Sequence, residues 1–186
     1  MTAPVSMTAQ IAPLDNNRFG VAMLQRKLAR MPDAVPVFDL DGVLLDASHR
    51  HKFLPCGALD LEQYRKDTTA ESVALDKPLP MLELVHWLNS VNRPYYVATA
   101  RVACEHTRAR LEAAQIRPLG IGARLGHDDR RPDPILKADY FESAFTESER
   151  QRMILLDDIA ANCQAAISCG MSAHQIVTEA GSLLIR

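Results

Sequence analysis

The sequence predicts an α/β fold in which a Rossmann-like parallel sheet carries helices on both faces. Short apolar runs of four or five residues alternate with segments of helical periodicity along most of the chain. Three of these runs end directly in polar groups, the first at Asp39, the second at Thr99 and the third at Asp157. Because ligands bind beyond the carboxyl ends of the strands in such sheets, we expect the three strand ends to form one site.

The first 34 residues are expected to form an N-terminal extension. Residues 1–17 show no pattern of a folded element, whereas Val21, Leu24, Leu28 and Met31 repeat at helical spacing. The repeat predicts an amphipathic helix of about 14 residues. We expect this helix to pack on its own domain. A homodimer contact is one alternative, and an organelle-targeting segment is another, since the stretch is rich in arginine and poor in acids.

Residues 35–186 are expected to form the domain that holds the site. A strand over 35–40 is followed by a polar insert over about 44–75, which contains a helix near 61–66 and would make a small cap. Beyond the insert, helical and strand patterns alternate. The expected order is helix 79–90, strand 94–99, helix 102–115, strand 120–124, a helix from 133, strand 153–157, a helix ending near 170 and strand 174–178.

Local signals support these boundaries. Leu82, Val85 and Leu88 lie on one stripe of the helix over 79–90, and Pro118 closes the helix over 102–115. Asp133 is expected to be an N-cap, because a proline follows it at the first helical position.

Composition indicates an ordinary globular domain of 186 residues. Hydrophobic residues make up 47 % of the chain and charged residues 24 %. The net charge of −2 creates no overall field for nucleic acid or anionic membrane, so a polyanionic ligand would need a local positive patch. The four cysteines lack metal-site spacing and a secretory context, so we expect reduced thiols and a cytoplasmic protein. No apolar run reaches the roughly 18 residues of a membrane span, so no membrane partner is expected.

The predicted site is acidic. Asp39, Asp41, Asp157 and Asp158 follow two of the three strands, and clustered carboxylates repel one another unless a cation or shared protons compensate. A hard divalent ion with oxygen ligands, most plausibly Mg²⁺, is the expected cofactor, with these four aspartates as its candidate ligands.

These residues resemble the pattern of the haloacid dehalogenase superfamily of phosphotransferases, over roughly residues 35–180. That pattern is Asp-x-Asp-Gly after the first strand, Ser or Thr after the second, a Lys, and paired acids after a later strand. The resemblance implies that Asp39 is a nucleophile that forms an aspartyl-phosphate, and that Asp41 is the general acid and base. It also implies that Thr99 contacts a phosphoryl oxygen and that Lys137 balances charge. Asp157 is expected to bind the metal and Asp158 to orient water or Lys137, but the sequence does not decide which of the two contacts the metal.

The alternatives for single residues are structural. The Asp-Gly step after the first strand could be a simple turn, and Thr99 could be an ordinary helix cap. Lys137 lies four residues after Asp133, so the two could form an exposed salt pair on one helix.

A narrower resemblance is to the phosphatase domain of bacteriophage polynucleotide kinase and its phage-type relatives. The residues on which this resemblance rests are Thr99-Ala-Arg101, the stretch from Asp128 to Lys137, and Arg50, which lies eleven residues after Asp39. It implies phosphate or substrate contacts by arginines and a positioning role for Asp133 toward Lys137. The candidate substrate contacts are Arg50, Arg101, Arg130, Arg131 and Asp133.

Two features separate the chain from that family. Ala100 stands where the pattern has glycine, and no Gly-x-x-x-x-Gly-Lys-Ser/Thr loop is present, so the kinase half is not expected. The resemblance therefore implies a phosphomonoesterase whose phosphorylated substrate is a nucleotide or a 3′-phosphorylated nucleic-acid end. A phosphatase of sugar or metabolite phosphates and a non-catalytic phospho-ligand binding protein are the alternatives.

Overall fold

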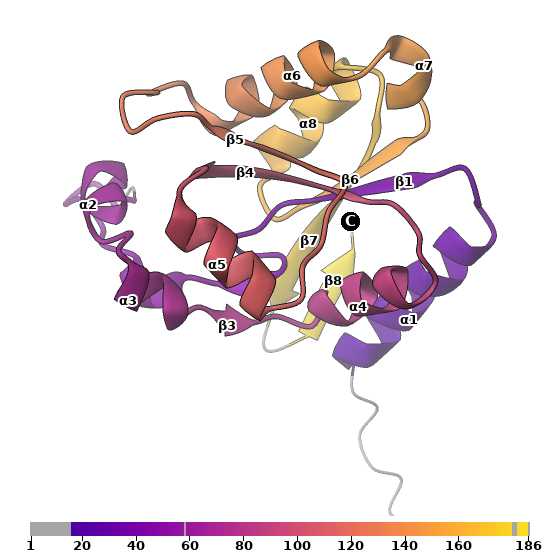
Figure 1. The fold of residues 1–186 in the computed structure, drawn as a ribbon, viewed down its shortest axis with the longest axis horizontal. Coiled ribbons are helices and arrows are strands. Elements are labelled where there is room, and N and C mark those ends of the chain that lie inside the picture. Colours follow the sequence, from indigo (N-terminus) through magenta and orange to yellow (C-terminus); the bar gives the residue numbers. More distant parts are fainter. Residues whose placement is uncertain (1–15, 58, 180–181, 186) are drawn as a thin grey trace, which may run out of the picture.

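The computed structural model describes residues 16–57, 59–179 and 182–185. Within these ranges a six-stranded sheet, with the strand order β5-β4-β1-β6-β7-β8, lies between two layers of helices (Figure 1). Its strands are β1 (Val35–Phe38), β4 (Tyr96–Val102), β5 (Gly120–Arg124), β6 (Met153–Asp157), β7 (Ser172–Glu179) and β8 (Ser182–Ile185). The helices around it are α1 (Asn16–Ala29), α4 (Leu82–Ser90), α5 (Glu105–Ala113), α6 (Asp133–Ala144), α7 (Glu147–Arg150) and α8 (Ala160–Ser168).

The sheet is parallel from β5 to β7, as the alternation of patterns predicts, and β8 adds an antiparallel edge strand that the sequence analysis did not predict. Strand β1 is central, because Val37 pairs with Tyr96 of β4 on one side and with Leu155 of β6 on the other. The chain order therefore reverses at β1, and the crevice for a ligand opens at this switch point.

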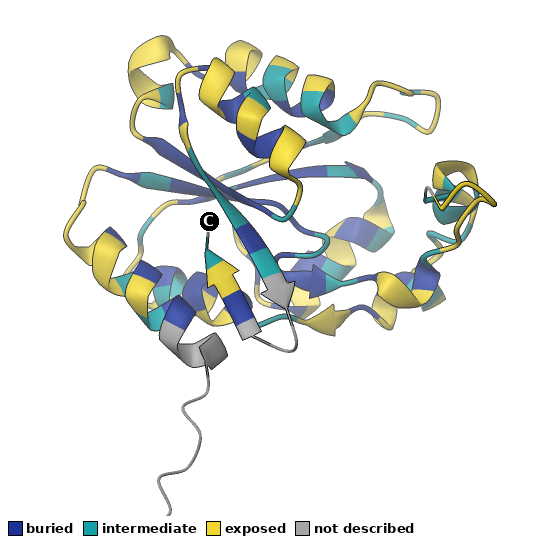
Figure 2. Ribbon diagram, turned by 180° about the vertical axis from the view of Figure 1, so that it is seen from behind, coloured by how far each residue is buried: buried dark blue, intermediate teal, exposed yellow. Residues whose placement is uncertain are grey.

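Alternate strand residues supply two separate cores. Phe38, Val97 and Leu156 pack with α1, α4 and α5 on one face, in the larger hydrophobic cluster. Val37 and Leu155 pack with α6 and α8 on the other face. Figure 2 shows the buried strands between the two helical layers. Because both faces are covered, the strands read as continuous apolar runs in the sequence.

A small cap follows β1. It consists of β2 (Leu45–Asp46), a 3₁₀ turn (Ser48–Arg50), α2 (Leu61–Lys66), α3 (Ala70–Ala74) and β3 (Lys77–Pro78), with β2 and β3 paired as an antiparallel ribbon. Helix α2 occupies the residues predicted for it, and the Asp60 side chain accepts a hydrogen bond from the Gln63 N–H at its start. Helix α2 lies on the left of Figure 1, beyond the sheet, and its Tyr64 hydroxyl donates to Asp41 of the loop after β1.

Helix α1 packs against α4 and β8 through Val21, Leu24 and Leu28, which are buried in the larger cluster. Its end is fixed by Arg93, whose guanidinium donates to the carbonyls of Leu28, Met31 and Ala34. Three of the four residues of the apolar stripe that a dimer could use are thus covered by the rest of the same chain, and the fourth, Met31, is exposed beyond the end of the helix. The homodimer through this helix stays a prediction, because no observation supports it.

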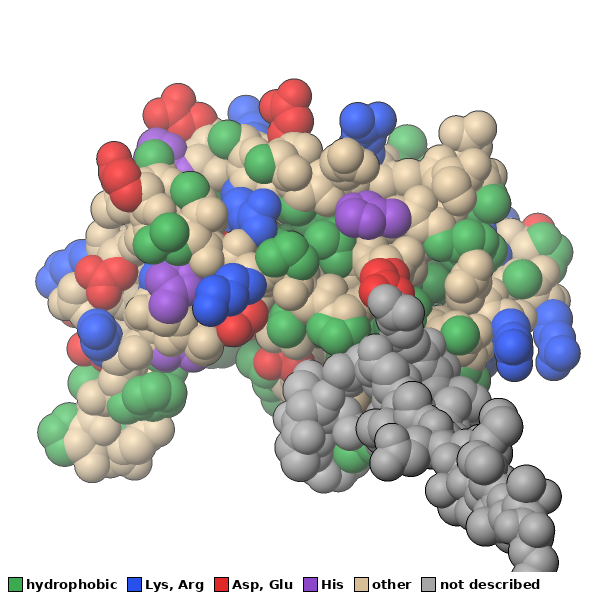
Figure 3. Space-filling model, turned by 90° about the horizontal axis from the view of Figure 1, so that it is seen from below, with side chains coloured by type: hydrophobic (Ala, Val, Ile, Leu, Met, Phe, Trp, Pro, Cys, Tyr) green, Lys and Arg blue, Asp and Glu red, His purple; other side chains and the backbone are tan. Residues whose placement is uncertain are grey.

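On the face seen from below, acidic and basic side chains are interspersed (Figure 3). Among the helices of the described ranges, none is both long enough and apolar enough to cross a membrane.

Candidate active site

The functional side chains follow three neighbouring strands at one edge of the sheet. Asp39 and Asp41 follow β1, Thr99 and Arg101 lie at the end of β4, and Asp157 ends β6. The end of β4 is irregular, because its register with β5 shifts between Ala98 and Val102. This shift covers the segment that carries Thr99 and Arg101.

Lys137 ties two of these strand ends together. It is the buried residue of α6 whose ammonium lies 2.9 Å from Oδ1 of Asp39 and 2.5 Å from Oδ2 of Asp157. Both carboxylates raise the pKa of Lys137 despite its burial, so the side chain stays charged. Lys137 therefore does not form the exposed salt pair with Asp133 that was its structural alternative.

Asp157 is fully buried, and protein donors occupy both of its carboxylate oxygens. Oδ1 accepts the backbone N–H of Ile159 at 2.9 Å and the Asn162 amide at 2.9 Å. Oδ2 accepts from Lys137 and, at 3.1 Å, from Asn162. The Lys137 contact that we expected of Asp158 is thus made by Asp157, because the last residue of β6 points to the same face of the sheet as α6.

Asp158 has the opposite surroundings. Its Oδ1 is buried without a hydrogen-bond partner among the described residues, and its carboxylate lies against Gly42. Gly42 has a φ of +79°, and a Cβ at this position would collide with the Asp158 carboxylate. Glycine is therefore required twice here, for the backbone conformation and for the close approach of Asp158 to the β1 loop.

Asp39, Asp157 and Asp158 bring carboxylate oxygens within 4.8 Å of one another. Three carboxylates against the one ammonium of Lys137 leave an excess of two negative charges. Burial, and then Asp157, raise the pKa of Asp158 to about 6, and burial raises the pKa of Asp39 even though Lys137 opposes this. The site therefore lacks positive charge and fits one divalent cation, with the free oxygen of Asp158 as a ligand atom.

Asp41 does not belong to this cluster, although it is one of the candidate ligands. Its carboxylate accepts hydrogen bonds from Arg101, at 2.9 Å from Nε, and from the Tyr64 hydroxyl at 2.8 Å. Burial opposes ionisation of Asp41, but Arg101 outweighs it and keeps the pKa of this carboxyl below its usual value. Asp41 is thus an ionised group on the Arg101 side of the pocket.

Two buried arginines share one buried acid. Arg50 and Arg101 both form ion pairs with Asp76, at 3.1 Å and 2.5 Å, and the Arg50 guanidinium also stacks over the Tyr64 ring at 4.7 Å. Arg50 thus lies behind the pocket wall and acts through Asp76 and Tyr64. Nη1 of Arg101 is buried without a partner among the described residues, so this group is available to a ligand.

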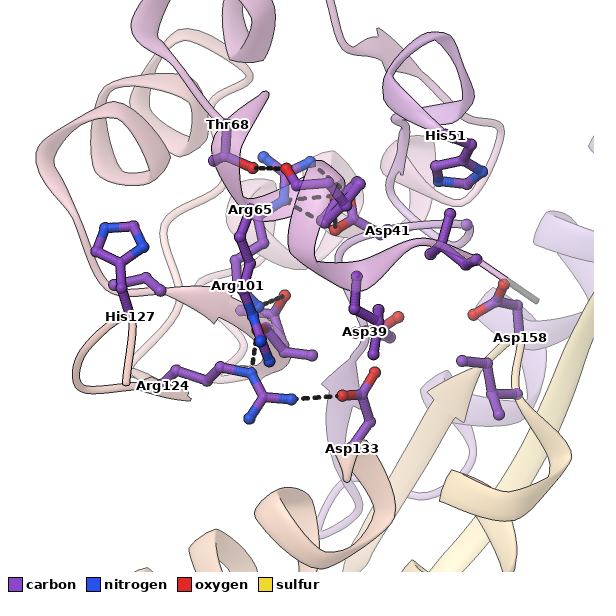
Figure 4. Close-up of a pocket in the computed structure, with 18 residues that line it drawn as sticks. Asp39, Asp41, His51, Arg65, Thr68, Arg101, Arg124, His127, Asp133 and Asp158 are labelled. Carbon is purple, nitrogen blue, oxygen red and sulfur yellow. Dashed lines mark hydrogen bonds and ion pairs between the residues drawn. The ribbon is translucent and has the colours of Figure 1, made fainter. Parts of the chain in front are cut away.

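A pocket of about 180 Å³ lies between the sheet edge and the cap (Figure 4). It is lined by Asp39, Asp41, Gly42, His51, Leu59, Leu61, Tyr64, Arg65, Thr68, Thr99, Ala100, Arg101, Val102, Arg124, His127, Asp133, Asp158 and Ile159. The volume is below the roughly 300 Å³ at which pockets enclose a drug-sized ligand, so it suits a phosphate group and its immediate attachment.

The structure differs from the sequence analysis in the loop before α6. Asp133, expected to position Lys137, instead accepts from Arg124 at 2.7 Å, because α6 begins at Asp133 itself and turns its side chain toward β5. Arg131 lies outside the pocket lining and pairs with Asp129 and Asp139. Arg130 is exposed and lies outside the lining as well.

Three contributors were not singled out from the sequence. Asp76 joins Arg50 to Arg101, Asn162 holds Asp157, and His127 lines the outer pocket. None of them is the last residue of a strand or directly follows one. Asn162 follows Asp157 by five residues and lies in the first turn of α8, and this spacing is the only signal that could have indicated it.

No protein-family model matches this sequence, and no curated protein matches it in sequence. The fold is similar to solved structures. A haloacid dehalogenase-like family hydrolase from Streptococcus pneumoniae matches with a TM-score of 0.59 and 18 % identity, over 82 % of this chain and 89 % of that one. A protein of Clostridium difficile assigned as a phosphatase matches with a TM-score of 0.60 and 15 % identity, over 80 % and 86 %.

A third match is to a chain of a Pnkp1/Rnl/Hen1 complex, with a TM-score of 0.58 and 18 % identity over 77 % of this chain. The matched region is only 45 % of that longer chain. At these identities the comparisons establish the fold, and the chemistry has to be argued from the residues of the site.

Proposed function

We propose that this chain, which has the haloacid dehalogenase fold, is a Mg²⁺-dependent phosphomonoesterase that works through an aspartyl-phosphate. The observation that carries the proposal is the set of groups around Asp39. A buried lysine lies 2.9 Å from Oδ1 of Asp39, two more carboxylates lie within 4.8 Å, and Asp41 lines the same phosphate-sized pocket. A non-catalytic phosphate-binding protein would have no use for this excess of negative charge.

Mg²⁺ is the cation that we assign to the acidic cluster. Asp39 and Asp158 would hold it, because Asp158 has the unpartnered oxygen, whereas protein donors occupy Asp157. When bound, the ion would neutralise part of the charge between the nucleophile and the phosphate dianion. Asp157 then fixes Lys137, which offsets a further charge.

In the first half of the reaction, Asp39 attacks phosphorus and the bond to the leaving alkoxide breaks. Thr99 and Arg101 line the pocket, and Nη1 of Arg101 has no hydrogen-bond partner among the described residues, so both side chains would donate to the phosphoryl oxygens. Asp41 protonates the alkoxide. The incoming phosphate dianion raises the proton affinity of Asp41, and this opposes the effect of Arg101.

In the second half, water attacks the aspartyl-phosphate while Asp41 accepts its proton. The ionised form that Arg101 and Tyr64 stabilise is the form that this step requires. Inorganic phosphate and free Asp39 are the products, so the cycle closes without another reactant.

We propose that the substrate is a nucleotide or a 3′-phosphorylated nucleic-acid end. The sequence motifs around Arg101 and Lys137 support this, and so does the fold similarity to a chain of a complex described as an RNA repair complex. The pocket accepts a phosphate and its attachment and opens beneath a small cap, so the rest of a long substrate would lie outside. The four free cysteines agree with the cytoplasmic location that the sequence predicts.

The test measures phosphate release from nucleoside 3′- and 5′-monophosphates, a 3′-phosphorylated oligonucleotide, hexose phosphates and p-nitrophenyl phosphate, with Mg²⁺ or with EDTA. We expect Mg²⁺-dependent release, and a loss of several orders of magnitude in Asp39→Asn, which keeps the side-chain shape but removes the attacking anion. Full activity in EDTA, or substantial activity of Asp39→Asn, would refute the mechanism. Preference for hexose phosphates would move the assignment to metabolites.

A further inference from the structure

The arginines around the pocket differ in whether a carboxylate already neutralises their charge. Arg101 pairs with Asp41 and Asp76, and Arg124 pairs with Asp129 and Asp133. Their guanidinium charges are therefore compensated before any ligand arrives. Behind the wall, Arg50 is compensated by Asp76 in the same way.

Arg65 is the exception within the described ranges. Its half-buried side chain lines the pocket, and its one hydrogen bond is a weak contact to the carbonyl oxygen of Asp129 at 3.4 Å. No carboxylate of the described residues lies within ion-pair distance of it. A carbonyl does not neutralise a cation, so Arg65 presents an uncompensated guanidinium to the pocket.

The surroundings of Arg65 favour the binding of an anion to it. Burial lowers the pKa of Arg65, and Arg130 and Arg124 lower it further against the smaller opposing effects of Asp133 and Asp129. Those two acids are already engaged by Arg124 and Arg131. The local field at Arg65 is therefore positive, although the whole chain carries a net charge of −2.

The position of Arg65 separates it from the reacting centre. Figure 4 shows Arg65, Arg124 and His127 on one side of the pocket, with Asp158 and His51 on the opposite side. Arg65 comes from α2 of the cap and His127 from the loop between β5 and α6. Between the two sides lies Asp39, the proposed nucleophile, so an anion at Arg65 would be distinct from the phosphate that is cleaved.

We propose that Arg65, on the side of the pocket that His127 also lines, binds a second phosphate of the substrate, so that the enzyme favours phosphomonoesters that carry another phosphate or a phosphodiester nearby. This inference rests on the proposed function. Guanidinium groups fork onto phosphate oxygens, and a half-buried setting strengthens the contact. The second phosphate could belong to a nucleoside bisphosphate, to the last phosphodiester of a nucleic-acid end or to a sugar bisphosphate.

Binding is measured by calorimetry with Asp39→Asn protein, which should not turn ligands over, and in EDTA, so that the weakened Mg²⁺ site of this variant does not affect the comparison. The probes are adenosine 3′-monophosphate, adenosine 3′,5′-bisphosphate, a 3′-phosphorylated dinucleotide, glucose 1-phosphate and glucose 1,6-bisphosphate. We expect the second phosphate to tighten binding about tenfold. Adding Arg65→Gln to the Asp39→Asn protein should reduce this gain in affinity to below about twofold. Raising the salt concentration should reduce the gain in the Asp39→Asn protein that keeps Arg65.

The matched control is Lys66→Gln, which removes the same charge from the next residue of α2. Lys66 is exposed and pairs with Glu62, so the gain should persist in this variant. Equal binding of mono- and bisphosphates by the parent, or a gain that survives Arg65→Gln, would overturn the inference. If the second phosphate tightens binding only in the nucleotide probes, the site recognises a nucleotide chain. If it also tightens binding of glucose 1,6-bisphosphate, the site recognises the phosphate group alone.

Phosphate release by the unmodified chain separates this inference from the proposed function. Release from monophosphates without a gain in binding from a second phosphate would refute only the Arg65 subsite. The reverse result, a gain in binding that depends on Arg65 with no release from any probe, would support the subsite and refute the phosphatase.

Discussion

Asp157 and Asp158 are neighbours in sequence, yet their environments assign them different tasks. Three donors hold Asp157, whereas Asp158 keeps a buried oxygen without a partner among the described residues. The strand-end pattern could predict that an acidic pair reaches the site, because it depends only on local sequence. It could not divide the roles, because Asn162 and Lys137 approach from α8 and α6 only in the folded chain.

The raised pKa of Asp158 predicts a pH-dependent stability for the metal-free protein. The pKa is about 6 in the folded chain and 3.8 as the ordinary value, so the folded state binds the proton more tightly. The free energy of unfolding should therefore fall as the pH rises from about 4 through 6. In EDTA at pH 7.5, Asp158→Asn should be more stable than the parent in urea denaturation. At pH 4 this difference should vanish, and a difference independent of pH would contradict the assignment.

Substitution of Asp76, which lies outside the pocket lining, is expected to lower the free energy of unfolding strongly. Asp76→Asn leaves two buried guanidinium groups without their shared counter-charge, and loss of one partner of a buried pair costs about 3–5 kcal/mol. Urea denaturation measures this loss. Glu62→Gln, which breaks an exposed pair, is the control and should change the free energy of unfolding by less than about 1 kcal/mol. Equal effects of the two substitutions would show that the Asp76 pairs contribute nothing.

At the scale of elements, the long periodic segments were predictable and the short ones were not. Strands β5 and β6 have the predicted bounds, and α4, α5 and α6 lie within about three residues of theirs. The ribbon β2–β3, with two residues in each strand, is too short to show a period of two. Strand β8 depends on pairing with β7 across a turn, so its four residues carry no clear signal of their own.

Helix α1 gives a prediction that separates packing within the chain from dimer formation. Leu28→Ala removes a buried side chain from the larger cluster and should cost about 2–5 kcal/mol in the free energy of unfolding, independent of protein concentration. Met31 lies beyond the helix and is exposed, so Met31→Ala should cost less than about 0.5 kcal/mol. If the cost of Leu28→Ala varied with protein concentration, the helix would instead be part of an interface between copies.

For the whole molecule, the excess charge at the acidic cluster predicts that Mg²⁺ stabilises the fold. A ligand present at a hundred times its dissociation constant adds about 2.7 kcal/mol. This corresponds to a rise of roughly 5–10 °C in the thermal midpoint of a chain of this size. The rise should shrink in Asp39→Asn and persist in Glu112→Gln, which removes an exposed charge. An unchanged midpoint across a Mg²⁺ titration would argue against the cation site.

The strand order has a consequence for how the protein is made. Asp39 is supplied early in the chain, but its partners Lys137 and Asp157 come about 100 and 120 residues later, and Asn162 later still. A ribosome must therefore synthesise most of the chain before the acidic cluster can be assembled around β1. Until β6 pairs with β1, the nascent polypeptide has neither a complete core nor the Lys137 and Asp157 side chains that surround Asp39. The proposed phosphatase activity should thus appear only after the residues up to Asn162 have left the ribosome, and its appearance would show that the non-local strand pairing is finished.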